Sequence, residues 1–202
     1  MRVNRILEET YAEGPGRRMC VYVQGCSHAC KGCFAEKLWD YSGGYECSAE
    51  EIITKLQQNS DSLDGITFLG GEPMDKAGEL ALVAREAKKL GLNVITFTGY
   101  TYEELLKSDN GGIKDLLEHT DLLIDGEFRE ELLDYSRPMV GSSNQRFIYL
   151  SDAISKEDIA AYKNRFEIRT DKNGGLTFNG MGNIKKLQKY IKDLSEENND
   201  TD

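Results

Sequence analysis

Between residues 19 and 150, short apolar segments alternate with longer amphipathic ones, and this order constrains the fold more than any other feature. The apolar segments are rich in β-branched and aromatic residues, which is typical of strands. Strands are therefore predicted at 19–24, 65–69, 92–98, 121–125 and 145–150. Because parallel neighbours need a long crossover between them, the order predicts an α/β fold with a parallel sheet.

The helices between these strands have their own start and stop signals. Ser48 and Glu51 have the spacing of a capping box, which predicts a helix over 48–58. A second helix is predicted over 75–91 and should end at Gly91, a residue type favoured just beyond a helix. Two short helical stretches are expected within 102–118.

The last quarter of the chain has a different pattern and predicts a small α+β appendage. A helix is expected at 156–164, then a hairpin over 165–180 with its turn at 171–175, then a charged helix at 183–194. We therefore divide the chain into a main domain at 1–150, an appendage at 151–195 and a disordered acidic tail at 196–202. The simplest interpretation of the appendage is a lid or a partner-docking element.

Composition excludes several functional classes. The net charge is −10 and no long basic cluster occurs, so a nucleic-acid partner is not expected. No signal peptide is evident and no apolar run approaches the ~20 residues of a membrane span. A cytoplasmic protein without membrane contact is therefore expected, and in that reducing compartment five cysteines do not indicate a disulfide framework.

Three of the cysteines, Cys26, Cys30 and Cys33, lie within eight residues directly after the first predicted strand. Thiolates at such close spacing bind zinc or an iron–sulfur cluster. His28 lies between two of them, and we expect it to line the site rather than to act as a ligand. Cys20 and Cys47 lack a partner cysteine at a suitable spacing. The expected site therefore has three thiolate ligands and an open fourth position.

Other unusual segments follow the next three predicted strands. GGEP at 70–73, TGY at 98–100 and Asp125-Gly126 each come directly after a strand. Because the carboxyl ends of parallel strands meet at one edge of a sheet, these segments should converge with the cysteines. The sequence therefore predicts one functional site at this edge.

The cysteine spacing followed by GGEP resembles the radical S-adenosylmethionine (SAM) superfamily. Within it, the chain is similar to the family of activating proteins of the anaerobic ribonucleoside-triphosphate reductase. Six segments over residues 11–150 carry that resemblance in order and spacing: VQGCSHACKGC, LWDYSGG, FLGGEP, FTGYTYEEL, LIDGEF and GSSNQR.

The resemblance implies a partial (β/α) barrel that holds one [4Fe-4S] cluster on Cys26, Cys30 and Cys33. It also implies that the fourth iron chelates SAM, and that reductive cleavage of SAM yields a radical that removes hydrogen from a glycine of the partner. That partner would be the large subunit of the anaerobic ribonucleotide reductase, and the electrons would come from a low-potential donor such as flavodoxin or ferredoxin.

The resemblance and the position of the loops suggest which other residues contact SAM or the partner. Arg17, in the segment EGPGRR, resembles a family segment that approaches the active site. The candidates for the cofactor are Gly32, Phe34, Gly70, Gly71, Glu72, Pro73, Thr98, Asp125, Asn144, Gln145 and Arg146.

Two alternatives to the activase stay open. One is a small radical SAM enzyme that acts on a different protein, peptide or metabolite, because Phe34-Ala35-Glu36 stands where family members often have His-Asn-Pro. The other is an iron–sulfur electron carrier or a zinc-stabilised interaction module. Only a cluster with an open site should release 5′-deoxyadenosine from SAM.

Overall fold

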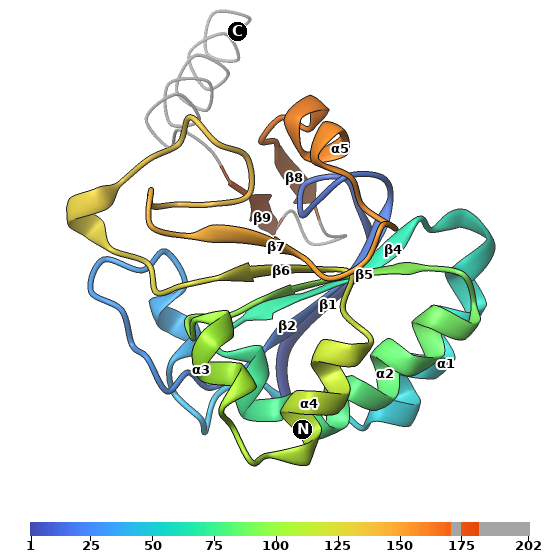
Figure 1. The fold of residues 1–202 in the computed structure, drawn as a ribbon. Coiled ribbons are helices and arrows are strands. Elements are labelled where there is room, and N and C mark those ends of the chain that lie inside the picture. The colour runs from blue at the N-terminus through green and yellow to red at the C-terminus, as the bar shows by residue number, and fades with distance from the viewer. Residues whose placement is uncertain (171–174, 182–202) are drawn as a thin grey trace, which may run out of the picture.

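The computed structural model describes residues 1–170 and 175–181, which form an α/β fold around a seven-stranded sheet (Figure 1). The strands of this sheet are β1 (Arg2–Thr10), β2 (Arg18–Val23), β3 (Tyr45–Glu46), β4 (Gly65–Gly70), β5 (Asn93–Phe97), β6 (Leu122–Asp125) and β7 (Arg146–Tyr149). A separate two-stranded hairpin consists of β8 (Phe166–Thr170) and β9 (Leu176–Gly180). The helices are α1 (Ala49–Asn59), α2 (Ala77–Lys89), α3 (Tyr102–Leu106), α4 (Gly111–Glu118) and α5 (Lys156–Ala161), with short 3-10 turns between some elements.

The strand order in the large sheet is β3-β1-β2-β4-β5-β6-β7. Strands β2, β4, β5 and β6 are parallel neighbours, which confirms the predicted parallel core. The parallel direction predicted for 145–150 is wrong, because β7 pairs antiparallel with β6. The segment between them contains only a 3-10 turn, η4 (Glu130–Leu132), so no helical crossover returns the chain to the start of β6.

Strand β1 was not predicted from the sequence, and it pairs antiparallel with β2. Its register shifts between Val3 and Arg5 and again between Leu7 and Thr10. Each irregularity interrupts the alternation of apolar and polar residues that identifies a strand. The segment therefore looks irregular in sequence although it is a nine-residue strand.

The predicted helix signals are confirmed. The Ser48 side chain accepts from the Glu51 backbone N–H, and Glu51 accepts in return from the Ser48 N–H, which completes the capping box. Helix α2 ends one residue before Leu90, and Gly91 has a φ of +76°, the left-handed conformation expected after a helix. None of the helices in the described part of the chain is long and apolar enough to cross a membrane.

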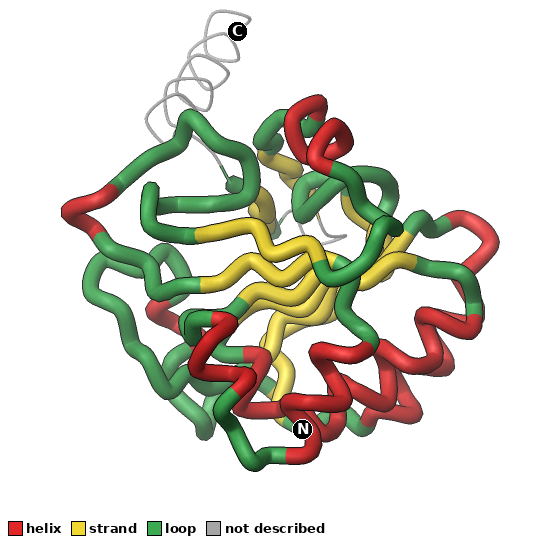
Figure 2. The backbone as a smooth tube through the Cα atoms, viewed as in Figure 1, coloured by secondary structure: helices red, strands yellow, loops and turns green. Residues whose placement is uncertain are grey.

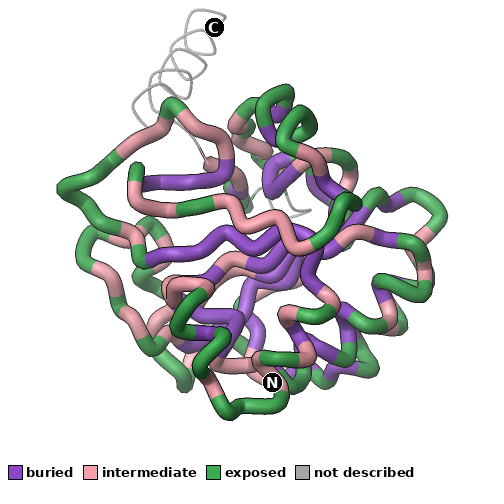
Figure 3. The backbone as a smooth tube through the Cα atoms, viewed as in Figure 1, coloured by how far each residue is buried: buried purple, intermediate pink, exposed green. Residues whose placement is uncertain are grey.

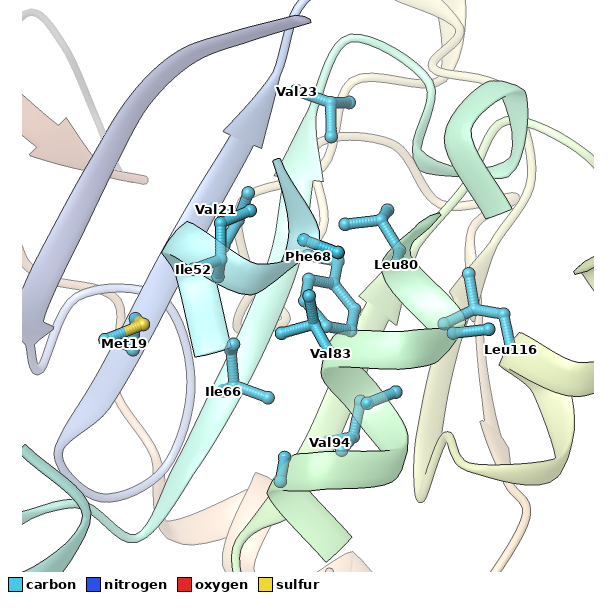
Figure 4. Close-up of a cluster of buried hydrophobic side chains, with 14 of the residues drawn as sticks. Met19, Val21, Val23, Ile52, Ile66, Phe68, Leu80, Val83, Val94 and Leu116 are labelled. Atoms are coloured by element: carbon cyan, nitrogen blue, oxygen red, sulfur yellow. The ribbon is translucent and has the colours of Figure 1, made fainter. Parts of the chain in front are cut away.

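The main core lies between one face of the sheet and helices α1, α2 and α4 (Figures 1 and 2). Side chains alternate along each strand, so one residue in two points to the helices. Figure 4 shows the contributions of β2, β4 and β5 facing the helices: Met19, Val21, Val23, Ile66, Phe68 and Val94. In Figure 3 the central strands are almost entirely buried.

The opposite face of the sheet carries a second set of side chains, including Cys20 and Tyr22 of β2. Helix α5 packs on this side through Ile159, which joins a cluster with Ile95 and Ile124. The predicted hairpin is confirmed by the antiparallel pairing of β8 with β9. Most of its turn, the helix predicted at 183–194 and the acidic tail lie outside the described residues.

Among the described residues the large sheet has two separate ends, β3 and β7, and forms no closed barrel.

A cavity at the carboxyl ends of the parallel strands

The carboxyl ends of the four parallel strands lie at one edge of the sheet, and a cavity of about 790 Å³ opens there. Cys26, Cys30 and Cys33 line it from the loop after β2. Gly71 and Glu72 after β4 line it as well. The structure therefore brings together the segments for which the sequence predicted one shared edge. Further residues contributed by the loops after β5, β6 and before β7 are Thr98, Gly99, Gly126 and Gln145.

The three cysteines of this loop are free thiols of intermediate exposure. The backbone N–H of Cys33 donates to the carbonyl of Cys30 at 3.1 Å, which forms a turn between the last two thiols. In the part of the chain that the structure describes, the three sulfurs do not all lie within 4.8 Å of one another. Four ligands around a zinc ion at ~2.3 Å would bring sulfurs to roughly 3.8 Å apart, so the loop is not preformed for a single zinc ion.

Backbone N–H groups point at these sulfurs. Burial raises the pKa of Cys26, whereas hydrogen bonds from the backbone of Ala29 and His28 oppose that change. Burial likewise raises the pKa of Cys30 against a backbone hydrogen bond from Phe128. The Ala35 N–H donates to Cys33 Sγ at 3.4 Å. Donors of this kind stabilise thiolate ligands of an iron–sulfur cluster, so the donor set fits such a cluster.

The GGEP segment brings the loop after β4 against the loop after β2. The Gly71 N–H donates to the Val23 carbonyl at 2.9 Å, and the Glu72 N–H donates to the Gly25 carbonyl at 2.9 Å. A Cβ atom on Gly71 would lie 2.0 Å from the Gly25 carbonyl oxygen, so a side chain cannot fit there. Gly70 has a φ of +113°, which only glycine adopts readily.

Glu72 is buried, and its carboxylate joins the turn that follows it to the loop after β5. It accepts from the Met74 N–H at 2.8 Å, the Thr98 hydroxyl at 2.8 Å and the Gly99 N–H at 2.7 Å. Burial raises the pKa of Glu72, and these donors oppose the change. Thus Glu72 caps the 3-10 turn η3 (Pro73–Lys76) and fixes the loop after β5 while it lines the cavity.

His28 lies between Cys26 and Cys30 in sequence, and its side chain is directed at the loops after β4, β5 and β6. Its Nε2 lies 3.4 Å from Glu72 Oε2 and its Nδ1 lies 3.0 Å from Glu127 Oε1. Its ring meets the Tyr100 ring edge-on, with centroids 4.3 Å apart. The imidazole lines the cavity, where it connects the cysteine loop to its neighbours.

The other candidate residues divide into two groups. Phe34, Thr98 and Gln145 line the cavity with the glycines and Glu72, and the Phe34 ring stays 61% exposed beside Phe128. Among the described residues the cavity wall does not include Gly32, Pro73, Asp125, Asn144 or Arg146.

Asp125 and Arg146 instead bind each other. Arg146 Nε donates to Asp125 Oδ1 at 2.9 Å, and its other nitrogens reach Glu103 at 2.6 and 3.2 Å. Asp125 also accepts from the Tyr102 N–H at 2.7 Å. These contacts attach helix α3 to the ends of β6 and β7 next to the cavity.

Arg17 does not face the cavity, contrary to the expectation from the sequence. It directly precedes β2 and so lies at the opposite end of the parallel strands, where its side chain pairs with Glu9. The cavity has a second wall that was not predicted from the sequence, and it is formed by Arg5, Glu13, Tyr22, Phe178 and Asn179. No pattern in the sequence indicates β1, so none predicts that Arg5 lies at this site.

The remaining two cysteines lie elsewhere. Cys20 is fully buried on the face of β2 that points away from helices α1 and α2, and its burial raises the pKa of its thiol well above the usual range. Cys47 is buried just before helix α1. Neither residue lines the cavity among the described residues, as expected from their spacing.

Comparison with known proteins identifies relatives along most of the chain. The family model described as "4Fe-4S single cluster domain" matches residues 12–148. A protein of Haemophilus influenzae is 34% identical over 139 residues, which cover 65% of this chain and 87% of that protein. A protein of Salmonella typhimurium is 32% identical over 152 residues, 72% of this chain and 96% of its own. A protein of Enterobacteria phage T4 is 28% identical over 166 residues, 78% of this chain and all of its own. Each of these three is named anaerobic ribonucleoside-triphosphate reductase-activating protein.

Proposed function

The chain belongs to the family of anaerobic ribonucleoside-triphosphate reductase-activating proteins, and on that premise we propose that it generates a glycyl radical on the anaerobic reductase with one [4Fe-4S] cluster and SAM. The enzyme is thus a radical SAM oxidoreductase of the glycyl-radical activase type. The observation that carries the proposal is the convergence of three free thiols and the GGEP loop on one cavity.

Cys26, Cys30 and Cys33 are the proposed ligands of the cluster. They belong to one short loop, line one cavity and receive backbone N–H donors at their sulfurs. Cys20 and Cys47 are buried away from that cavity, so a [4Fe-4S] cluster bound there would have three thiolate ligands, and its fourth iron would be available to SAM. When bound, the cluster and SAM supply one-electron cleavage of a carbon–sulfur bond and abstraction of hydrogen from glycine.

For SAM, the proposed contacts are the residues that line the cavity beside the cysteines. Gly70 and Gly71 allow the backbone to approach the cofactor closely, and Glu72 offers a carboxylate for its ammonium group. Phe34, Thr98 and Gln145 complete this part of the wall. The sequence also predicts cofactor contacts for Gly32, Pro73, Asp125, Asn144 and Arg146. Because none of them lines the cavity among the described residues, the role proposed for them is to hold these loops in place.

Several finer features belong to the same proposal. The seven-stranded sheet with its two separate ends is consistent with the partial barrel that the resemblance implies. The proposed domains are a main domain at 1–150 and an appendage at 151–195. The partly exposed cysteine loop would allow a flavodoxin or ferredoxin to deliver electrons, and free thiols suit a cytoplasmic protein.

The experiment that tests the cluster assignment uses anaerobically reconstituted protein. Iron, sulfide and release of 5′-deoxyadenosine are measured after reduction with dithionite in the presence of SAM. Alanine at Cys26, Cys30 or Cys33 should abolish release, whereas Cys20→Ala, which removes a thiol of the same chain outside the cavity, should retain it. Bound zinc, or a cluster that never cleaves SAM, would instead support an interaction module or an electron carrier.

A further inference from the structure

The cavity extends from the cysteine loop to the C-terminal hairpin, and the hairpin end has no role in the function proposed above. There its wall includes Arg5 of β1, Tyr22 of β2 and residues Phe178 and Asn179 of β9. The whole cavity, at about 790 Å³, is in the upper part of the range of roughly 300–1,000 Å³ for ligand sites. The residues proposed to hold the cofactors lie on loops at the carboxyl ends of the strands. The hairpin end of the cavity is therefore available for another ligand.

The hairpin is held firmly against β1 and the segment after it. The Gly180 N–H donates to Glu13 Oε1 at 2.8 Å, and Asn179 Nδ2 donates to the Thr10 hydroxyl oxygen at 2.9 Å. On β8, Glu167 accepts from the Thr10 hydroxyl and the Tyr11 N–H, both at 2.7 Å. This wall of the cavity is therefore formed before any ligand binds, which lowers the entropic cost of binding.

The chemistry of this wall suits a polypeptide. The Phe178 ring lines the cavity and is 38% exposed, so it offers uncovered apolar surface. The Arg5 guanidinium lies 4.1 Å from the centroid of the Tyr22 ring and donates to the Phe178 carbonyl at 3.1 Å. Aromatic and arginine side chains are enriched among the residues that dominate protein interfaces. Leu69 and Phe97 connect this wall to the cysteine end along the sheet.

A glycine offers no side chain for recognition, so selection of the target glycine must depend on its neighbours in the partner. A chain segment that presents one glycine to the cysteine end must also place its flanking residues in the same cavity. From this geometry, and resting on the proposed function, we propose that Arg5, Phe178 and Asn179, the hairpin wall, bind the residues that flank the target glycine of the reductase. Phe178 packs on an apolar flanking side chain, and Arg5 donates to a carbonyl or carboxylate of the segment.

The test compares Phe178→Ala with Leu176→Ala, a matched control two residues away on β9 that is 56% exposed and does not line the cavity among the described residues. Three quantities are measured for each full-length protein under anaerobic conditions. They are the dissociation constant for the purified reductase by calorimetry, the glycyl radical formed at increasing reductase concentration, and 5′-deoxyadenosine released without reductase.

For Phe178→Ala we expect the dissociation constant, and the reductase concentration for half-maximal radical formation, to rise about tenfold, as for loss of an aromatic interface residue. Release of 5′-deoxyadenosine without reductase should stay as in the wild type. Leu176→Ala should change none of the three, and Phe178→Leu, which keeps an apolar side chain, should restore most of the binding.

The three measurements separate an error in the hairpin wall from an error in the proposed function. If the wild-type protein forms the glycyl radical and Phe178→Ala forms it at the same reductase concentration, only the hairpin wall is refuted. If Phe178→Ala also loses release of 5′-deoxyadenosine without reductase, the wall acts on the cofactor end and the inference is again wrong. If the wild-type protein cleaves SAM but forms no radical on the reductase, both proposals are overturned.

Discussion

The carboxylate of Asp75 accepts two hydrogen bonds from Ser27, one from its backbone N–H at 3.1 Å and one from its hydroxyl at 3.0 Å. The Tyr41 hydroxyl donates to the same carboxylate at 2.5 Å. Ser27 directly follows Cys26, and Asp75 lies in the turn after GGEP. The carboxylate therefore fixes the cysteine loop to the loop that is proposed to bind SAM.

The first prediction concerns this contact. Asp75→Ala should lower the free energy of unfolding by about 1 kcal/mol, because hydrogen bonds to a partly exposed carboxylate are lost. It should also lower the iron retained after reconstitution and slow the cleavage of SAM, since the cysteine loop is less constrained. Denaturant unfolding and iron analysis provide the measurements. Asp61→Ala, at an exposed aspartate of the 3-10 turn Ser60–Ser62, is the control and should change neither the stability nor the retained iron. Equal iron retention in the two variants would show that Asp75 does not position the loop.

A second prediction follows from the close approach of Gly71 to Gly25. Gly71→Ala should destabilise the fold by about 3 kcal/mol or more, because the added Cβ would overlap the Gly25 carbonyl oxygen. Gly78→Ala is the matched control on helix α2, where a Cβ meets nothing within 4 Å. It should stabilise the protein by about 0.5 kcal/mol. Thermal unfolding of both variants measures the contrast, and an unchanged melting temperature for Gly71→Ala would contradict the close packing of the two loops.

The third prediction separates the two roles of Glu72. Glu72→Ala leaves the Thr98 hydroxyl and the Met74 and Gly99 N–H groups without their acceptor, which should cost about 2 kcal/mol of stability. SAM binding should weaken while the iron content is retained, since no thiolate is lost. Equilibrium binding of SAM to the reconstituted protein and iron analysis test this expectation. Unchanged SAM affinity would show that the GGEP segment is only a structural turn.

The fourth prediction concerns Glu13, whose pKa burial raises from 4.5 to about 7, against a hydrogen bond from the Tyr22 hydroxyl. Between those two values the folded protein keeps a proton that the unfolded chain has lost. Stability should therefore fall as the pH rises from about 4.5 to about 7, by up to about 3 kcal/mol from this residue.

Glu13→Gln tests this pH dependence because its amide oxygen can still accept from Tyr22 and from the Gly180 N–H. The variant should be more stable than the wild type at pH 8, and the advantage should vanish near pH 4.5, where the wild-type glutamate is protonated in the folded state. Urea unfolding at both pH values measures the difference. The same advantage at both pH values would show that Glu13 does not titrate in this range.

Much of the fold and of the site could be predicted from the sequence because the signals are local. The capping box of Ser48 and Glu51 and the apolar strand segments identify the elements of the parallel core. Parallel strands end at one edge, so the order of Cys26, Gly71, Thr98 and Gly126 along the chain predicts their meeting in space.

Features that depend on long-range pairing could not be predicted in this way. The direction of β7 depends on the path of residues 126–145, which contain no helix longer than a 3-10 turn. The irregular register of β1 interrupts its alternation of apolar and polar residues, so neither the strand nor the position of Arg5 can be predicted from the sequence. The contact of Gly180 with Glu13, 167 positions apart in sequence, brings Phe178 to the cavity, and no local pattern indicates it.

Radical formation on the partner is tested by an anaerobic electron paramagnetic resonance spectrum of the reduced, reconstituted protein with SAM and the anaerobic reductase of the same organism. We expect a glycyl-radical doublet on the reductase that requires SAM, is absent with Cys26→Ala and persists with Cys20→Ala. Release of 5′-deoxyadenosine by the wild-type protein without any doublet would refute activation of the reductase and would indicate a different radical substrate.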